Sequence, residues 1–330
     1  MSVCVVGGGS WATSLVKLLL RNQVKVYWWV RKQEKVDYIL QNGHNPNYLS
    51  GVDLALKPEE MGTSLPDLLQ KTDTVLLAVP SFFVKEVLEQ TQPLDWQGKK
   101  IITAVKGLIK GDNLLPTDYF RQILGVPREN LMMLTGPSHA EEVAFKRLTY
   151  LTIGSYETTN FELADCLFNT SFIRLKYSND VEGLEFSAIL KNIYAIAAGI
   201  CHRLGYGDNF QAVLVSNAIK EIELFLQHIC PLDNRPILDN GYLGDLLVTA
   251  YSQFSRNRSF GHMIGEGYET KIALMEMRMV PEGYYSIAPM YDLKAQKGVK
   301  MPILDAVHQC IHGDRLKRAE VIKNMTENIY

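Results

Sequence analysis

Short apolar runs and longer helical patterns take turns along the first half of the chain. Residues 3–6 form a β-branched run that ends in three glycines, residues 11–20 carry apolar side chains at helical spacing, and residues 24–30 are rich in β-branched and aromatic side chains. This order predicts a βαβ unit with parallel strands. Further strands are expected at residues 74–79, 100–105, 131–134 and 150–153. We therefore predict a doubly wound α/β domain with a parallel sheet over residues 1–180.

The pattern changes at residue 181, where the strand signals stop. Long apolar stretches at residues 182–204 and 210–229 have the spacing of helices, and shorter ones follow at 242–254 and 301–311. There is no internal repeat and no obvious flexible linker in the sequence. We predict an all-α domain over residues 181–330, joined to the first domain directly through its first long helix.

Composition limits the classes of protein that fit. The chain has 330 residues, about the length of two domains, and 47% of them are hydrophobic. Its 34 Lys and Arg residues nearly balance 36 Asp and Glu residues, which argues against nucleic acid as the main partner. No apolar run reaches the roughly 18 residues of a membrane span, and we expect no signal peptide. Five scattered cysteines without a C-x-x-C pair are typical of reduced thiols, so we expect a cytoplasmic protein.

The first glycine cluster fits a dinucleotide-binding turn. Gly7, Gly9 and Ala12 occupy the small positions of the G-x-G-x-x-[GA] fingerprint, between the first predicted strand and the first predicted helix. The first glycine allows the tight turn, the second lets the backbone approach a pyrophosphate, and the helix start offers unpaired N–H groups to phosphates. Glycine turns also occur without cofactors, but this strand–turn–helix context favours a Rossmann domain that binds NAD or NADP.

The end of the second predicted strand bears on which dinucleotide binds. NAD-binding chains usually place an acidic residue there to hold the ribose, whereas this chain has Arg31 and Lys32 and no acidic residue before Glu34. Arg31 is suited to a 2′-phosphate, so we expect NADP to be accepted. The alternative, that Arg31 and Lys32 form a solvated turn, stays open.

Small polar residues follow other predicted strands at the edge where such sheets bind ligands. Lys106 comes directly after one strand. It could hold a carbonyl oxygen or hydroxyl of a substrate by a charge-assisted hydrogen bond, or it could simply end an exposed turn. Gly136 and Ser138 follow another strand at a helix start. His139 beside them is more often structural in such a position, so we assign it no role.

Several motifs in a fixed order resemble the bacterial type of NAD(P)-dependent glycerol-3-phosphate dehydrogenase. They are the segments 7–13 (GGGSWAT), 79–81 (VPS), 105–108 (VKGL), 136–142 (GPSHAEE), 190–193 (LKNI), 243–246 (LGDL), 255–258 (SRNR) and 280–283 (VPEG). Each motif is common alone, but the ordered series is specific and covers nearly the whole chain. Tyr242 stands where the family usually has a glycine, which leaves the placement of Asp245 open.

The resemblance implies an NAD(P)H-dependent interconversion of dihydroxyacetone phosphate and sn-glycerol 3-phosphate, a precursor of glycerophospholipids. It implies Lys191 as the general acid/base. The substrate contacts it implies are Lys106, Gly136, Ser138, Lys191, Asp245, Ser255, Arg256 and Asn257. The cofactor contacts, with the fingerprint glycines, are Gly7, Gly9, Ser10, Trp11, Arg31, Lys106, Ala140, Arg256, Val280 and Glu282.

Ketone reduction needs a proton donor, and Lys191 has a suitable setting. It lies among apolar and small residues, and burial lowers the pKa of a lysine towards the range in which it both donates and accepts a proton. A lysine with a buried stem and a solvated head fits the residues equally well, and only the resemblance favours catalysis. Asp245 fits a contact to Lys191 or a helix cap, and Arg256 fits a phosphate site or a charged helix end.

Two other functions stay open. One is a related hydroxyacid or opine-type dehydrogenase, whose substrate would need fewer anion donors. The other is a non-catalytic NADP-sensing protein, which would not need Lys106, Lys191 and Asp245 together. No metal site is expected, since there is no H-E-x-x-H motif. The expected partner is a small-molecule substrate, and the helical domain could supply the face of a homodimer.

Overall fold

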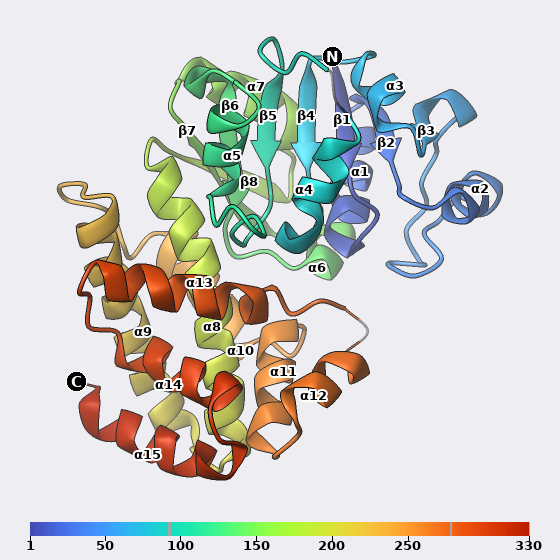
Figure 1. Ribbon diagram of the computed structural model, residues 1–330. Helices are drawn as coiled ribbons and strands as arrows, with labels where there is room; N and C mark the ends of the chain where they lie inside the picture. Colours follow the sequence, from blue (N-terminus) through green and yellow to red (C-terminus); the bar gives the residue numbers. More distant parts are fainter. Residues whose placement is uncertain (92–93, 278, 330) are drawn as a thin grey trace. The chain divides into compact units, whose positions relative to one another are not determined.

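The chain folds into two compact units. In a computed structural model that describes residues 1–91, 94–277 and 279–329 (Figure 1), the first unit comprises Met1–Val105 and Ile109–Val181. The second comprises Lys106–Leu108 and Glu182–Tyr330, so a three-residue segment that follows a strand of the first unit belongs by its contacts to the second.

The first unit is built on an eight-stranded sheet with the order β3-β2-β1-β4-β5-β6-β7-β8. Its strands are β1 (Ser2–Val6), β2 (Lys25–Trp29), β3 (Met61–Gly62), β4 (Thr74–Leu77), β5 (Lys100–Thr103), β6 (Leu131–Thr135), β7 (Thr149–Ser155) and β8 (Ile173–Ser178). The strand order reverses beside β1, between β1 and β4. In sheets of this kind ligands bind outside the carboxyl ends of the strands at that point.

The sheet is mostly parallel, as expected, with one antiparallel pair of strands near one edge. β3, β2, β1, β4, β5 and β6 are parallel, but β7 pairs with β6 in antiparallel register and β8 runs parallel to β7. Two strands, β3 and β8, were not predicted from the sequence. β3 has only two residues, and β8 alternates buried with exposed and charged side chains because it is an edge strand.

Helices cover both faces of this sheet. They are α1 (Ser10–Arg21), α2 (Gln33–Asn42), α3 (Leu65–Leu69), α4 (Ser81–Glu89), α5 (Pro116–Gln122), α6 (Ala140–Ala144) and α7 (Thr159–Phe168). Alternate residues of β1 point to opposite faces, so Val5 joins one apolar cluster with Leu15 of α1. Val6 joins the other with Leu69 of α3 and Val84 of α4. Burial on both faces explains why β1 reads as an unbroken apolar run.

The second unit is helical. Its helices are α8 (Val181–Arg203), α9 (Asp208–Ile229), α10 (Asp245–Tyr251), α11 (Arg256–Gly265), α12 (Thr270–Glu276), α13 (Glu282–Gln296), α14 (Pro302–His312) and α15 (Arg318–Asn328). The helix expected at 242–254 is shorter than predicted, because residues Asn240–Gly244 form a π-helical turn before α10.

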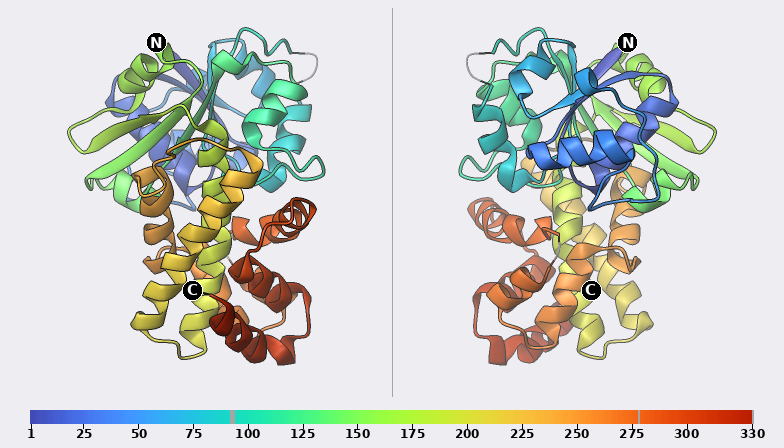
Figure 2. Two further views of the ribbon diagram at one scale, coloured as in Figure 1. Left: turned by 90° about the vertical axis from the view of Figure 1, so that its left-hand side faces the viewer. Right: turned by 90° about the vertical axis from the view of Figure 1, so that its right-hand side faces the viewer.

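α8 is the core helix of this unit (Figure 2, yellow-green). By length and composition it is the one helix of the described residues that could cross a membrane, but its apolar stretch is entirely buried by protein. Core helices of soluble proteins show the same character. α11 crosses it closely: a Cβ on Gly199 would lie 2.1 Å from the carbonyl oxygen of Arg258, and one on Gly261 would lie 2.1 Å from that of Ile196.

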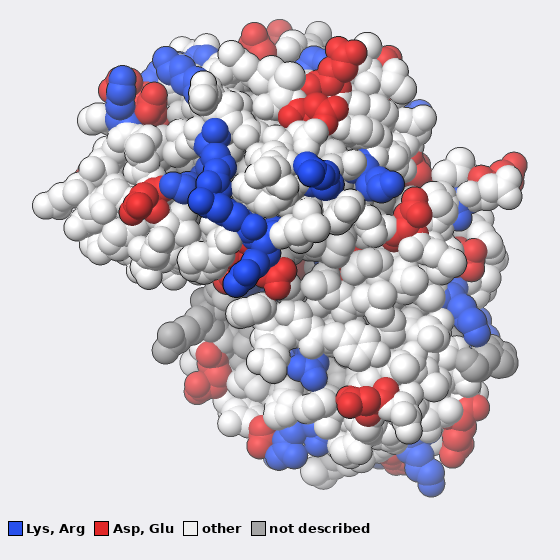
Figure 3. All heavy atoms as spheres, turned by 180° about the vertical axis from the view of Figure 1, so that it is seen from behind, with Lys and Arg blue, Asp and Glu red and all other residues white. Residues whose placement is uncertain are grey.

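Charged side chains of both signs share the surface. On the face drawn in Figure 3, Lys and Arg gather in a band, and Asp and Glu lie around it. This distribution agrees with the formal net charge of -2, and on that face the basic residues form a local band rather than a continuous surface.

Candidate active site

In the first unit, the glycine turn links β1 to α1 as its sequence predicts. Gly7 has a φ of +134°, and a Cβ there would lie 2.4 Å from the carbonyl oxygen of Ala78, so only glycine fits. A Cβ on Gly9 would meet nothing within 4 Å, which leaves open space beside the turn. Trp28 of β2 fixes the turn, because its Nε1 donates to the Gly7 carbonyl oxygen at 2.6 Å.

The start of α1 has a buried polar atom without a partner, as expected where a dinucleotide binds. Ser10 and Trp11 are its first residues, and Nε1 of Trp11 is buried without a hydrogen-bond partner. An unpaired buried N–H is costly, and a polar ligand beside α1 would relieve that cost. With the open space at Gly9 and the positive end of the helix dipole, these residues suit a pyrophosphate.

Arg31 is exposed at the end of β2. Its guanidinium lies 5.6 Å from the ring centroid of Phe83, a cation–π distance. The neighbouring Lys32 pairs with Glu34 at 3.1 Å between Nζ and Oε1, with both side chains exposed.

Gly136, Ser138 and Ala140 follow the carboxyl end of β6. Gly136 has a φ of +109°, and a Cβ there would lie 2.9 Å from the carbonyl oxygen of Tyr150 on β7. The Ser138 hydroxyl donates to the Gly136 carbonyl oxygen at 3.1 Å, and Ala140 is the first residue of α6. The turn therefore places a hydroxyl group and a helix start at the ligand-binding edge of the sheet.

In the second unit, two lysines share one buried carboxylate. The ammonium of Lys191, from the middle of α8, donates to Oδ1 of Asp245, the first residue of α10. Nζ of Lys106 lies 3.4 Å from Oδ2 of the same residue. Nζ of Lys191 also donates to Oγ1 of Thr249 at 3.1 Å, and Thr249 donates to the Asp245 carbonyl oxygen at 2.6 Å. The buried Tyr242 does not prevent Asp245 from reaching Lys191.

The charges of this cluster act on Lys191. Burial lowers the pKa of Lys191 to about 7; the carboxylate of Asp245 opposes that change and the ammonium of Lys106 adds to it. A lysine whose pKa is close to neutrality can both donate and accept a proton at physiological pH. The alternative of a solvated head group does not fit, since the side chain is only 5% exposed.

A chain of amides ties this cluster to two more helices. Nδ2 of Asn192 donates to the Lys106 carbonyl oxygen at 3.2 Å, and Nδ2 of Asn257 on α11 donates to Oδ1 of Asn192 at 3.0 Å. Oδ1 of Asn257 accepts from the Gly283 backbone N–H on α13 at 2.9 Å. Ser255 caps α11, because its hydroxyl accepts from the Arg258 N–H at 3.3 Å.

Glu282 is a buried carboxylate at the first position of α13. Burial raises its pKa, while Arg256, Lys106 and Lys191 lower it, so these cations lie near it. Its Oε2 is buried without a hydrogen-bond partner. Val280, two residues earlier, is half-buried.

The predicted residues therefore fall into two groups. The first unit holds Gly7, Gly9, Ser10, Trp11, Arg31, Gly136, Ser138 and Ala140. The second holds Lys106, Lys191, Asp245, Ser255, Arg256, Asn257, Val280 and Glu282. Direct hydrogen bonds join Lys106, Lys191 and Asp245, and Asn257 reaches them through Asn192. Ser255 acts locally as the cap of α11, and Val280 lies two residues before Glu282.

Thr249 and Asn192 contact the predicted residues but were not singled out from the sequence. A signal for each is present. Thr249 lies four residues after Asp245, the spacing of neighbours on one helix face, and Asn192 directly follows Lys191.

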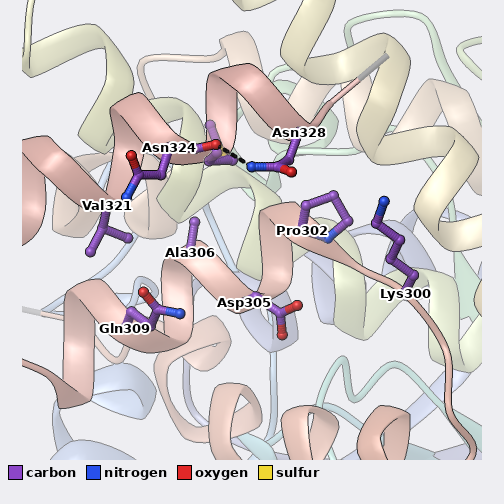
Figure 4. Close-up of a pocket in the computed structure, with 9 residues that line it drawn as sticks. Lys300, Pro302, Asp305, Ala306, Gln309, Val321, Asn324 and Asn328 are labelled. Carbon is purple, nitrogen blue, oxygen red and sulfur yellow. Dashed lines mark hydrogen bonds between the residues drawn. The ribbon is translucent and has the colours of Figure 1, made fainter.

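A surface pocket of about 240 Å³ lies elsewhere in the second unit, between α14 and α15 (Figure 4). It is lined by Lys300, Pro302, Asp305, Ala306, Gln309, Val321, Asn324, Met325 and Asn328. None of the predicted site residues lines it, and Asp305 is already paired with Lys294. Within the described part of the chain, no three His, Cys, Asp or Glu side chains are grouped so as to hold a metal ion.

Known proteins match the chain over nearly its whole length. Residues 2–161 match the family model for the NAD-dependent glycerol-3-phosphate dehydrogenase N-terminus, and residues 180–322 match the model for its C-terminus. Glycerol-3-phosphate dehydrogenase [NAD(P)+] of Syntrophomonas wolfei is 36% identical over 97% of this chain and 93% of its own. The protein of the same name from Chlorobium limicola is 34% identical over 99% of this chain and 98% of its own.

A solved structure agrees with these matches. The crystal structure of glycerol-3-phosphate dehydrogenase from Coxiella burnetii superposes with a TM-score of 0.90 at 29% identity, over 99% of this chain and 98% of that one. The family models, the two relatives and this solved structure all carry the name glycerol-3-phosphate dehydrogenase. The chain belongs to the NAD(P)-dependent glycerol-3-phosphate dehydrogenase family.

Proposed function

We propose that the protein reduces dihydroxyacetone phosphate to sn-glycerol 3-phosphate with NADPH or NADH, and catalyses the reverse reaction. The observation that carries this proposal is the buried Lys191, whose ammonium meets Asp245 and Thr249 and whose pKa is lowered to about 7. The family relatives bear the name of this activity. A purely cofactor-sensing protein would not need such a cluster.

The dinucleotide site belongs to the first domain, residues 1–180, in this proposal. Gly7, Gly9, Ser10 and Trp11 would hold the pyrophosphate, and Arg31 the adenosine side. Further cofactor contacts would come from Ala140, Lys106, Arg256, Val280 and Glu282. The unpaired Nε1 of Trp11 and the unpaired Oε2 of Glu282 support this set, since each lacks a partner that a polar ligand would supply. When bound, the nicotinamide supplies the hydride that reduces the ketone.

Proton transfer falls to Lys191 in the second domain, residues 181–330. During reduction the protonated amine donates a proton to the oxygen that becomes the C2 hydroxyl, and the amine is left neutral. In the reverse direction the neutral amine removes the hydroxyl proton. Asp245 and Thr249 hold the amine in one orientation through both steps, and the second ammonium on Asp245, that of Lys106, keeps the proton of Lys191 easy to lose.

The substrate is a phosphate monoester, which requires strong donors. We assign its binding to Lys106, Gly136, Ser138, Asp245, Ser255, Arg256 and Asn257. The guanidinium of Arg256 suits a phosphate because it offers two parallel N–H donors, and its place among the cations near Glu282 supports an anion site. We further propose a cytoplasmic homodimer that supplies glycerol 3-phosphate for phospholipid synthesis.

One assay separates this function from its alternatives. The purified protein is mixed with NADPH and either dihydroxyacetone phosphate, the unphosphorylated dihydroxyacetone, or a 2-keto acid, and the absorbance of the reduced nicotinamide is followed. We expect turnover with the phosphorylated ketone alone. Turnover with the keto acid instead would favour a hydroxyacid dehydrogenase. Binding of NADPH without any turnover would favour the sensor.

A further inference from the structure

We propose that Lys35 is a specificity-determining residue that favours a dinucleotide carrying a 2′-phosphate over one that ends in a free hydroxyl. The inference rests on the dinucleotide site proposed above. Lys35 belongs to the first unit, and it is neither part of the glycine fingerprint nor the arginine at the end of β2, Arg31.

Lys35 reaches from α2 into the glycine turn. It lies in the first turn of that helix, and its Nζ donates to the carbonyl oxygen of Gly8 at 2.6 Å. Gly8 stands between the two glycines of the fingerprint. The buried Asn45 supports the same turn, with its Nδ2 3.4 Å from the Gly8 carbonyl oxygen and 2.7 Å from Oγ1 of Thr13. The amine of Lys35 therefore connects the glycine turn to α2, the helix that follows β2.

The charge of Lys35 has no anionic partner among the described residues. It is half-buried, burial lowers its pKa to about 8, and no carboxylate opposes that change. The ring of Tyr48, at 4.8 Å from Nζ to the centroid, is its other neighbour. Lys32, three residues earlier, is by contrast exposed and paired with Glu34. Lys35 is thus a cation whose environment lacks a negative charge.

The position of this charge points to the 2′ group of the adenosine ribose. In Rossmann domains the group that reads this ribose lies just after the second strand, beside the glycine turn. Lys35 lies six residues beyond Trp29, the last residue of β2, and touches the turn itself. A 2′-phosphate would bring the missing charge, whereas a 2′-hydroxyl would not. Arg31 is exposed and its guanidinium lies over the ring of Phe83, whereas Lys35 is half-buried. Of the two cations, Lys35 is therefore the more shielded from water.

The test compares the two nucleotides on three variants. Dissociation constants for NADPH and NADH are measured by the fluorescence of the bound reduced nicotinamide, without substrate. Lys35→Met removes charge and hydrogen bond, Lys35→Gln keeps a donor for the Gly8 carbonyl, and Lys32→Met is a control that removes one exposed charge nearby. We expect Lys35→Met and Lys35→Gln to weaken NADPH binding about tenfold or more while NADH changes less than about twofold. Lys32→Met should leave the ratio of the two constants within about twofold.

Two results would overturn the inference. Equal loss of both nucleotides in Lys35→Met, with recovery of both in Lys35→Gln, would assign Lys35 to holding the glycine turn. An unchanged ratio in both variants would remove it from recognition altogether. Retained NADH binding serves as the check that a variant has folded. Failure of the dinucleotide site itself would be seen separately, as absence of binding of both nucleotides to the unsubstituted protein.

Discussion

Lys106 and Asp245 are separated by 138 residues of sequence, yet Nζ of one lies 3.4 Å from Oδ2 of the other. The second oxygen of that carboxylate holds Lys191. Because Asp245 is almost fully buried, its charge is screened little by water and acts strongly on both amines. One carboxylate therefore links Lys106, which we propose binds the substrate, to Lys191, which we propose transfers the proton.

Replacing Asp245 with Asn should remove the charge and keep the shape. The carboxylate raises the pKa of Lys191 against the effect of burial, so its loss should lower that pKa below about 7. We expect kcat for reduction at pH 7 to fall about 100-fold, with the pH at which reduction is half-maximal displaced to lower values. Steady-state kinetics across pH measure both quantities. A variant with normal kcat and an unmoved pH profile would remove Asp245 from the mechanism.

The two directions of the reaction should respond oppositely to pH. The pKa of Lys191 is lowered to about 7, so the amine is mostly protonated below that pH and mostly neutral above it. Reduction uses the protonated amine, and kcat should decline as pH rises through about 7. Oxidation uses the neutral amine, and kcat should decline as pH falls through the same region. Parallel declines in both directions would contradict the assignment of one group to both steps.

Thr249 should act as a positioning residue for Lys191. Its hydroxyl accepts from Nζ at 3.1 Å, and its own proton is committed to the Asp245 carbonyl oxygen. Thr249→Val keeps the volume but leaves the amine one acceptor short, so we expect kcat to fall about tenfold while the dissociation constant of NADPH stays within about twofold. Thr249→Ser should restore most of kcat. Equal losses in both variants would mean that the methyl group, not the hydroxyl, matters.

Gly7 and Gly9 should fail in different ways. A Cβ on Gly7 would lie 2.4 Å from the Ala78 carbonyl oxygen at a φ of +134°, so Gly7→Ala should lower the free energy of unfolding by about 2 kcal/mol or more. Gly9→Ala meets open space, so it should change that free energy by less than about 1 kcal/mol. It should instead weaken NADPH binding about tenfold, because the methyl group takes the place of a pyrophosphate.

Denaturant unfolding and nucleotide binding test this pair of glycines together. We expect the larger stability loss in Gly7→Ala and a binding loss without a stability loss in Gly9→Ala. If Gly9→Ala binds NADPH as tightly as the unsubstituted protein, the pyrophosphate does not lie against that glycine.

Local patterns along the chain account for much of the fold. The β-branched run before Gly7 predicts β1, and the long apolar segment from residue 182 predicts α8, because both are buried on all sides and show it in composition. The strand at β7 was expected, but its antiparallel direction was not, since strand direction has no local sequence signal. The edge strand β8 was missed, since an edge strand lacks a continuous apolar run.

The site could be predicted only in part from the sequence, because its contacts join residues far apart along the chain. Lys191 stands out because a lysine is unusual in so apolar a helix, but its contacts with Asp245 and Thr249 span 54 and 58 residues. These hydrogen bonds form because α8 lies against α10 in the folded protein. No spacing of residues in the sequence predicts them. Lys35 was overlooked because a lysine in the first turn of an exposed helix looks like an ordinary solvated charge until its contact with Gly8 is seen.

The most direct test of the account is the rate of NADPH oxidation by dihydroxyacetone phosphate in Lys191→Ala, beside the exposed-lysine control Lys32→Ala. Saturating concentrations are used, and the dissociation constant of NADPH is measured in the same samples. We expect a loss of kcat on the order of 1,000-fold or more, as for removal of a general acid, with NADPH binding preserved and the control unaffected. Substantial turnover by Lys191→Ala would contradict it.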